Sequence, residues 1–183
     1  MFLHFNPHKA IQAAGVLLRA EGNRMSYLRL LKLLYIADRE AIRDSGVPIL
    51  GCKAVAMRDG PLHSDIYNLI RGIHEQISLW GRFFCTQGYK LEAVQQPDIG
   101  LLSQYEIEKL QAVAAKYAPF SDFDICHDMT HTFDEWLANY KEGTSRPIQI
   151  EDIIKAVGRG GDTDAILEDL HELEEMDKIM SEA

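Results

Sequence analysis

Residues 27–37 most constrain the fold, because nearly every residue in this stretch is apolar. Ser26, just before it, is a residue type that caps helices, and the leucines that follow fall on all sides of a helix. A helix without a polar face is stable in water only when other elements surround it. The stretch therefore predicts a buried central helix that becomes polar beyond Ala37 and ends at Ser45-Gly46. Three carboxylates would form a solvated face at its far end: Asp38, Glu40 and Asp44.

The rest of the chain predicts further helices and one small hairpin. Residues 83–86 and 89–94 flank Gln87-Gly88 and are rich in strand formers, as is typical of a two-stranded hairpin. Residues 47–59 are predicted to be irregular or extended, and Gly60-Pro61 to form a turn. The predicted fold class is mainly α with a small β-hairpin (α+β), a helical domain around the central helix. Residues 1–157 would form this domain, and residues 158–183 a glycine-rich hinge and an acidic C-terminal helix.

The net charge of −9 is concentrated at the C-terminal end. Residues 162–183 hold nine acids and one lysine, which leaves 19 acids and 18 bases in residues 1–161. Proteins that bind phosphate backbones need a basic excess, so direct nucleic-acid binding is disfavoured. The three cysteines are widely spaced and form no metal-binding pair. No apolar run approaches the length of a membrane span. We therefore expect a soluble cytoplasmic protein. The nearest candidate for a basic recognition face is Arg29, Lys32, Arg39 and Arg43.

The acidic C-terminal segment carries one apolar stripe. Its members are spaced by four, three, three and four residues, as on one face of a helix. Such a helix gains most of its stability by docking, and the stripe leaves three surfaces open. It could pack on its own domain, on a second copy of the chain in a homodimer, or in a groove of a partner protein. The stripe consists of Ile166, Leu170, Leu173, Met176 and Met180.

The strongest candidate for chemistry is a pair of histidines, His127 and His131, four residues apart on one helix face. Two imidazoles at this spacing can bind zinc, which would make the protein a metal-dependent hydrolase. However, Asp128 stands where a zinc hydrolase motif needs the longer glutamate as general base. We interpret both histidines as structural, with His131 packing near Trp136. The sequence therefore predicts no enzyme, no metal site and no cofactor.

Several blocks in order resemble the Panacea domain, also called the SocA-like antitoxin domain. The first are residues 32–39 (KLLYIADR), 46–49 (GVPI) and 54–61 (AVAMRDGP), followed by Ser64, Ile66 and Tyr67. The later blocks are Leu102-Ser103 with Glu106, Lys116-Tyr117, Ser121, Thr130-His131, Trp136 and residues 150–153. The resemblance covers about residues 7–157, and it departs from the family pattern at Arg58-Asp59 and at Glu135. Its structural motif residues are Lys32, Tyr35, Asp38, Gly60, Pro61, His131 and Trp136.

The resemblance implies an antitoxin of a toxin–antitoxin system, a kind of protein that also occurs in prophages. Such a protein neutralises a partner toxin by direct binding; the alternative is an adaptor that delivers the bound toxin to a protease. We expect Gly60 and Pro61 to fix a turn around which the partner-binding side chains are displayed, because a rigid loop loses little entropy on binding. The candidate contacts are Arg58, Asp59, His63, Asp65 and Tyr67 around this turn, and Ile166, Leu170, Leu173 and Met176 on the C-terminal helix.

Overall fold

The computed structural model describes residues 5–182, and the side chains of residues 177 and 180–182 lie outside this description. It confirms the predicted fold class, mainly α with a small β component. The helices are α1 (Pro7–Ala20), α2 (Tyr27–Ser45), α3 (Ser64–Arg71), α4 (Ile77–Trp80), α5 (Gln104–Tyr117), α6 (Asp134–Asn139), α7 (Ile150–Ala156) and α8 (Thr163–Glu182). The strands are β1 (Arg24–Ser26), β2 (Ala54–Met57), β3 (Gly60–His63), β4 (Phe84–Gln87), β5 (Lys90–Ala93) and β6 (Arg146–Ile148). Short π or 3-10 turns are η1 (Asp124–Met129), η2 (Thr130–Thr132) and η3 (Gly160–Asp162).

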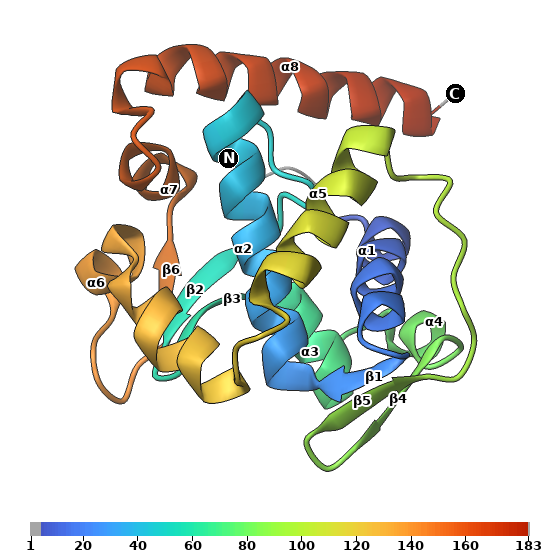
Figure 1. Ribbon diagram of the computed structural model, residues 1–183. Helices are drawn as coiled ribbons and strands as arrows, with labels where there is room; N and C mark the ends of the chain where they lie inside the picture. The colour runs from blue at the N-terminus through green and yellow to red at the C-terminus, as the bar shows by residue number, and fades with distance from the viewer. Residues whose placement is uncertain (1–4, 183) are drawn as a thin grey trace.

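The predicted central helix is α2, which the other elements surround (Figure 1). Its N-cap Ser26 accepts a hydrogen bond from the Arg29 amide at 3.0 Å, and Gly46 ends the helix with a φ of 86°. Helices α1 and α5 and strand β3 pack against α2. Leucines on all its sides are buried, as a helix without a polar face requires.

The C-terminal half of α2 is less exposed to solvent than the presence of three carboxylates in the sequence led us to expect. Asp38 is buried, which corrects the prediction of an exposed position. Glu40 accepts a hydrogen bond from Lys116 at 2.8 Å, and Asp44 accepts one from Lys109 at 2.6 Å. Because both lysines belong to α5, these ion pairs join α2 to α5.

Two three-stranded antiparallel sheets flank the helices, in the orders β1-β5-β4 and β3-β2-β6. The first contains the predicted hairpin, β4–β5, with Phe84 opposite Ala93. The second sheet was not predicted, because residues 47–59 were expected to be irregular or extended but no pairing partner was assigned to them. In it, Ala54 of β2 lies opposite both His63 of β3 and Ile148 of β6. Glycine and proline weaken the strand signal of β3 and β6, and β6 comes from a distant part of the chain.

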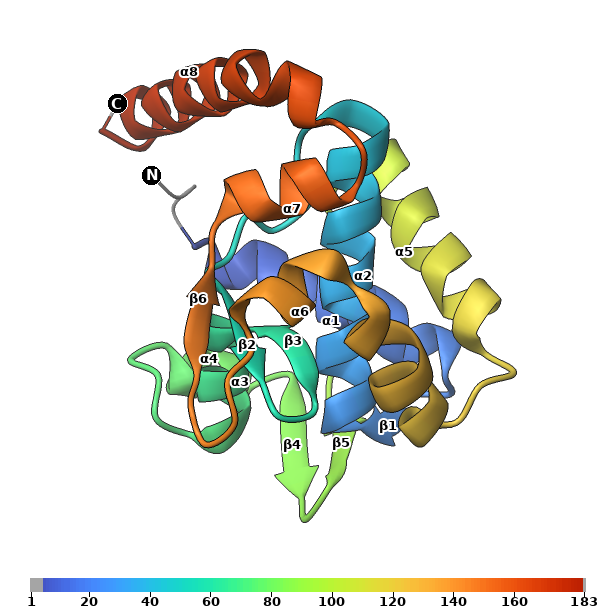
Figure 2. The ribbon, with the colours of Figure 1, turned by 90° about the vertical axis from the view of Figure 1, so that its left-hand side faces the viewer.

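Helix α8 lies across the end of the molecule opposite the β4–β5 hairpin (Figures 1 and 2). Ile166 and Leu170 are buried in a second core cluster, together with Ile42 of α2 and Ile153 and Ile154 of α7. The first half of the acidic helix thus packs on its own domain, one of the three surfaces that the sequence left open. The side chain of Met180, the last member of the predicted stripe, lies outside the described residues.

Residues 158–161, predicted as a flexible hinge, form a defined turn. Gly158 ends α7 with a φ of 84°, and the Arg159 amide donates to the Ile154 carbonyl at 3.0 Å. The Arg159 guanidinium also reaches the Ile42 carbonyl of α2 at 3.4 Å. These hydrogen bonds position the start of α8 over the end of α2. In the described part of the chain, no helix has both the length and the apolar character needed to cross a bilayer.

Candidate partner-binding surface

The turn between β2 and β3 consists of Arg58 and Asp59, since Met57 pairs with Gly60 in the strand register. Both turn residues are exposed. Gly60 has a φ of 96°, which L-residues rarely adopt. A Cβ at this position would overlap the Thr130 hydroxyl and come within 3.1 Å of Lys32 Nζ. Glycine is therefore required here both by the backbone and by close packing.

Lys32 lies fully buried beneath this hairpin. Its ammonium donates a hydrogen bond to the Pro61 carbonyl at 2.8 Å. Burial lowers the pKa of Lys32 to about 8, against smaller opposing effects of Cys126 and Asp59. Burial likewise raises the pKa of the Cys126 thiol to about 11, although the nearby Lys32 lowers it. The Lys32 ammonium thus fixes the start of β3 through its hydrogen bond to Pro61, and burying this charge costs the hydration of the ammonium.

Trp136 supports the same hairpin from the other strand. Its indole Nε1 donates to the Met57 carbonyl at 2.9 Å. The His131 ring stacks on the indole, with ring centroids 4.1 Å apart and an interplanar angle of 3°, and Tyr140 stacks as well. This stacking confirms the prediction that His131 packs against Trp136. Burial, with smaller effects of His127 and Lys32, lowers the pKa of His131, so the neutral ring is favoured.

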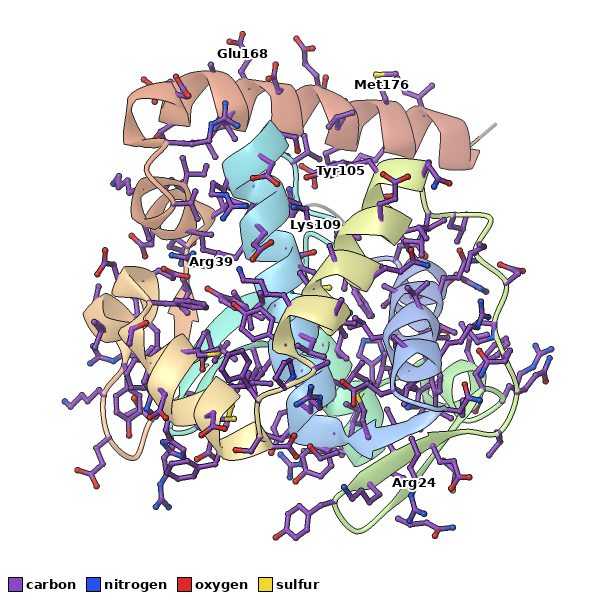
Figure 3. The ribbon with its side chains drawn as sticks, viewed as in Figure 1. Arg24, Arg39, Tyr105, Lys109, Glu168 and Met176 are labelled. Atoms are coloured by element: carbon purple, nitrogen blue, oxygen red, sulfur yellow. The ribbon has the colours of Figure 1, made fainter. Side chains whose placement is uncertain are left out.

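A buried carboxylate, Glu135, joins α6 to α2. It accepts hydrogen bonds from the Tyr35 hydroxyl at 3.1 Å and from Arg39 Nε at 2.7 Å. The Arg39 guanidinium, labelled in Figure 3, also lies 4.1 Å from the centre of the Phe133 ring. Burial, followed by the charge of Glu135 and its hydrogen bond, raises the pKa of Tyr35 well above its usual value. Glu135, where the sequence departs from the family pattern, is thus fully paired inside the protein.

His63 is only 3% exposed, so the expectation that it is displayed to a partner is wrong. Its Nε2 lies 3.3 Å from Asp38 Oδ2. Asp38 in turn accepts hydrogen bonds from the amides of Leu50 and Gly51, at 3.0 and 3.2 Å. His63 is the last residue of β3, and its ring faces α2, with its centroid 5.6 Å from that of the Tyr35 ring. Both side chains therefore belong to the interior that positions the loop before β2.

Tyr27, at the start of α2, lies close enough to Asp59 of this turn for the Asp59 charge to act on it. Tyr27 stacks on Tyr89, with ring centroids 5.9 Å apart, and Arg71 lies 5.4 Å from the centre of the Tyr67 ring. Burial raises the pKa of Tyr27, and Tyr67, Tyr89 and Asp59 are close enough to raise it further. Tyr27 therefore connects these groups into one surface. We call it the hairpin-turn surface: Tyr27, Arg58, Asp59, Tyr67, Arg71 and Tyr89.

Three of the six residues of the hairpin-turn surface were not predicted from the sequence: Tyr27, Arg71 and Tyr89. Tyr27 was assigned to the buried helix, and Tyr89 to a hairpin strand. Tyr89 is 77% exposed, and its position directly after Gln87-Gly88 was a usable signal for a side chain displayed at a hairpin turn. Arg71 carried no signal beyond its place at the end of α3.

The other candidate contacts lie elsewhere. Asp65 is in the first turn of α3, on the side of the buried Cys52 thiol, whose pKa is raised by burial and by Asp38 and Asp65. Ile166 and Leu170 are buried, so they cannot contact a partner as predicted unless α8 detaches. Leu173 and Met176 are 39% and 58% exposed, and Met176 points away from the body of the protein (Figure 3).

The rival interpretations receive little support from the geometry. The rings of His127 and His131 meet edge to face, with centroids 4.7 Å apart. Within residues 5–182, no group of three or more His, Cys, Asp or Glu side chains could hold a metal ion. Arg29 and Lys32, proposed for a basic recognition face, are both buried. Arg29 donates to the carbonyls of Tyr117 and Phe120, and these hydrogen bonds fix the end of α5.

The fold and this surface define a mainly helical domain in which a buried lysine and a tryptophan support a short hairpin with an exposed turn. The family model described as "Antitoxin SocA-like, Panacea domain" matches residues 30–137, which run from α2 to α6. The chain therefore belongs to the SocA-like antitoxin family with a Panacea domain. The comparisons with curated proteins and with solved structures found no match.

Proposed function

We propose that this protein is an antitoxin that neutralises a protein toxin by binding it directly through the hairpin-turn surface. The family supports the general role, since its members are described as antitoxins. The observation that carries the specific proposal is the exposed Arg58-Asp59 turn on a supported hairpin, with Tyr27 near Asp59 and stacked on Tyr89.

The composition of this surface suits protein recognition. Tyrosine and arginine dominate the residues that contribute most to binding energy in protein interfaces. Arg58 and Asp59 present opposite charges side by side, which favours a partner with the complementary pair and fixes its orientation. The buried contacts of Lys32 and Trp136 hold the hairpin before binding, so little conformational entropy is lost when the toxin docks.

The first test is co-expression with the product of the neighbouring reading frame. We expect the chain to restore growth and to co-purify with that product. Sequestration predicts that the amount of toxin in the cell stays constant while its activity is lost. A fall in the amount of toxin would instead indicate the adaptor mechanism, delivery to a protease.

The second test reverses both turn charges, Arg58→Glu with Asp59→Lys. Both residues are exposed, so we expect the melting temperature of the variant to equal that of the wild type. Toxin binding should weaken by about tenfold or more, because each reversed charge would repel the toxin charge that paired with the original residue. The matched control reverses two exposed charges elsewhere, Arg82→Glu with Glu108→Lys, and also leaves the net charge unaltered. Equal affinity of the wild type and the turn variant would reject this surface as the toxin contact.

A further inference from the structure

A pocket of about 320 Å³ lies between α7, α8 and the chain just before β2. This volume is near the lower end of the range for ligand sites, roughly 300–1,000 Å³, so the pocket suits one long side chain. Its walls are mostly apolar. They are formed by Gly51, Cys52, Ala54, Ile148, Ile150, Ile153, Leu167 and Leu170, with Glu151, Glu168, His171 and Glu174 as polar members.

Glu174 gives this pocket its chemical character. It lines the pocket and is only 8% exposed. No hydrogen bond or ion pair joins its carboxylate to another residue in the described part of the chain. The rest of the side chain is covered while the carboxylate oxygens remain accessible from the pocket, so a cation that enters the pocket can pair with them beside apolar walls that exclude water. Glu174 therefore marks the place where a positive group would bind.

The surrounding charges favour the same kind of ligand. Glu151 lies on the α7 side of the pocket, and residues 162–183 carry a balance of −8. The acidic character of α8 attracts cations and repels phosphates. Glu168, although its residue borders the pocket, points away from the body of the protein (Figure 3), so Glu174 and Glu151 are the carboxylates that a bound cation would meet.

We propose that this pocket binds an arginine side chain presented by a partner protein. The three-carbon stem of the arginine would lie against Ile153 and Leu170, and its guanidinium would pair with Glu174. Arginine suits a partly buried carboxylate better than lysine does, because its guanidinium is planar, less strongly hydrated and able to donate two parallel hydrogen bonds. The site lies on α7 and α8, apart from the hairpin-turn surface, and does not depend on the proposed toxin contact.

The chemistry can be tested on the full-length protein with hexylguanidinium, a small mimic of the arginine side chain. The neutral control is hexylurea, which has the same shape without the charge. Binding is followed by amide chemical shifts in nuclear magnetic resonance spectra at about 150 mM salt, which screens exposed charges. We expect saturable shifts confined to residues 51–54, 148–153 and 167–174, with a dissociation constant in the millimolar range, and at least tenfold weaker binding of hexylurea.

Two isosteric variants locate the site. Glu174→Gln should weaken hexylguanidinium binding at least about tenfold, because it removes the charged half of the pair. Glu172→Gln is the matched control: it removes the same charge from an exposed position of the same helix and should change the affinity by less than about twofold. Similar losses in both variants, equal binding of hexylurea, or shifts that do not saturate would overturn the proposal. Thermal unfolding of both variants verifies that they are folded.

Discussion

Raising the pH from 7 to 9.5 should stabilise this protein relative to a variant that lacks the Lys32 ammonium, Lys32→Met. Burial lowers the pKa of Lys32 from 10.5 in the unfolded chain to about 8 in the folded one. Between these two values the unfolded state binds more protons than the folded state, so stability rises with pH. The cost of burying the charge is fully present below pH 8 and is relieved above it.

The size of the effect follows from the two pKa values. The full difference corresponds to roughly 3 kcal/mol, of which about 2 kcal/mol should be regained between pH 7 and 9.5. The raised pKa values of Tyr27, Tyr35 and Tyr105 act in the opposite direction at alkaline pH, since the unfolded tyrosines lose protons first. These contributions are common to the wild type and the variant, so they cancel when the two are compared.

The assay is urea unfolding at pH 7 and 9.5 of the wild type, Lys32→Met and Lys53→Met. Lys53 is exposed, so its variant should follow the pH dependence of the wild type. The difference in unfolding free energy between wild type and Lys32→Met should shift by about 2 kcal/mol in favour of the wild type at the higher pH. If this difference changes by less than about 0.5 kcal/mol between pH 7 and 9.5, the argument that Lys32 is buried as a charged group beneath the hairpin is refuted.

Two further predictions concern the packing of the hairpin and of α8. Gly60→Ala should cost about 3 kcal/mol or more, because it combines an unfavourable φ with overlap at Thr130, whereas Gly88→Ala, with open space around it, should cost only about 1 kcal/mol. Similar losses at both glycines, measured by urea unfolding, would show that close packing at Gly60 contributes nothing. Ile166→Ala should cost about 2–4 kcal/mol and Met176→Ala less than about 0.5 kcal/mol, since only Ile166 is buried. Equal melting temperatures for these two variants would contradict the packing of α8 on its own domain.

Short-range signals allowed much of the fold to be predicted. The capping residues Asn6, Ser26 and Ser103 each accept the expected amide hydrogen bond. The β4–β5 hairpin forms where its local pattern indicated, but the turn is Gly88-Tyr89, one residue later than predicted, because Gln87 pairs with Lys90. These features depend on residues within a few positions of one another, and such patterns are visible in a single sequence.

The candidate site was predicted less completely. Arg58 and Asp59 were placed correctly in an exposed turn, but His63, four residues later, points into the protein. Gly60-Pro61 indicated a turn, so residues 60–63 were not recognised as a strand and the inward direction of His63 could not be predicted. The contact between Tyr27 and Tyr89 was not predicted, because it joins the start of α2 to the tip of a hairpin far along the chain.

The amino-acid sequence alone determined that this protein has a buried central helix, a neutral domain and an acidic amphipathic end, since these follow from local periodicity and charge. Only the tertiary structure decided which polar side chains are interior. Lys32, Asp38 and Glu135 are buried because each meets a hydrogen-bonding partner supplied by a different segment. Tertiary packing also decided which part of α8 is covered, because α7 and the Arg159 turn place Ile166 and Leu170 in the core. A buried charge is stable only where such a partner exists, and the position of that partner is a property of the folded chain.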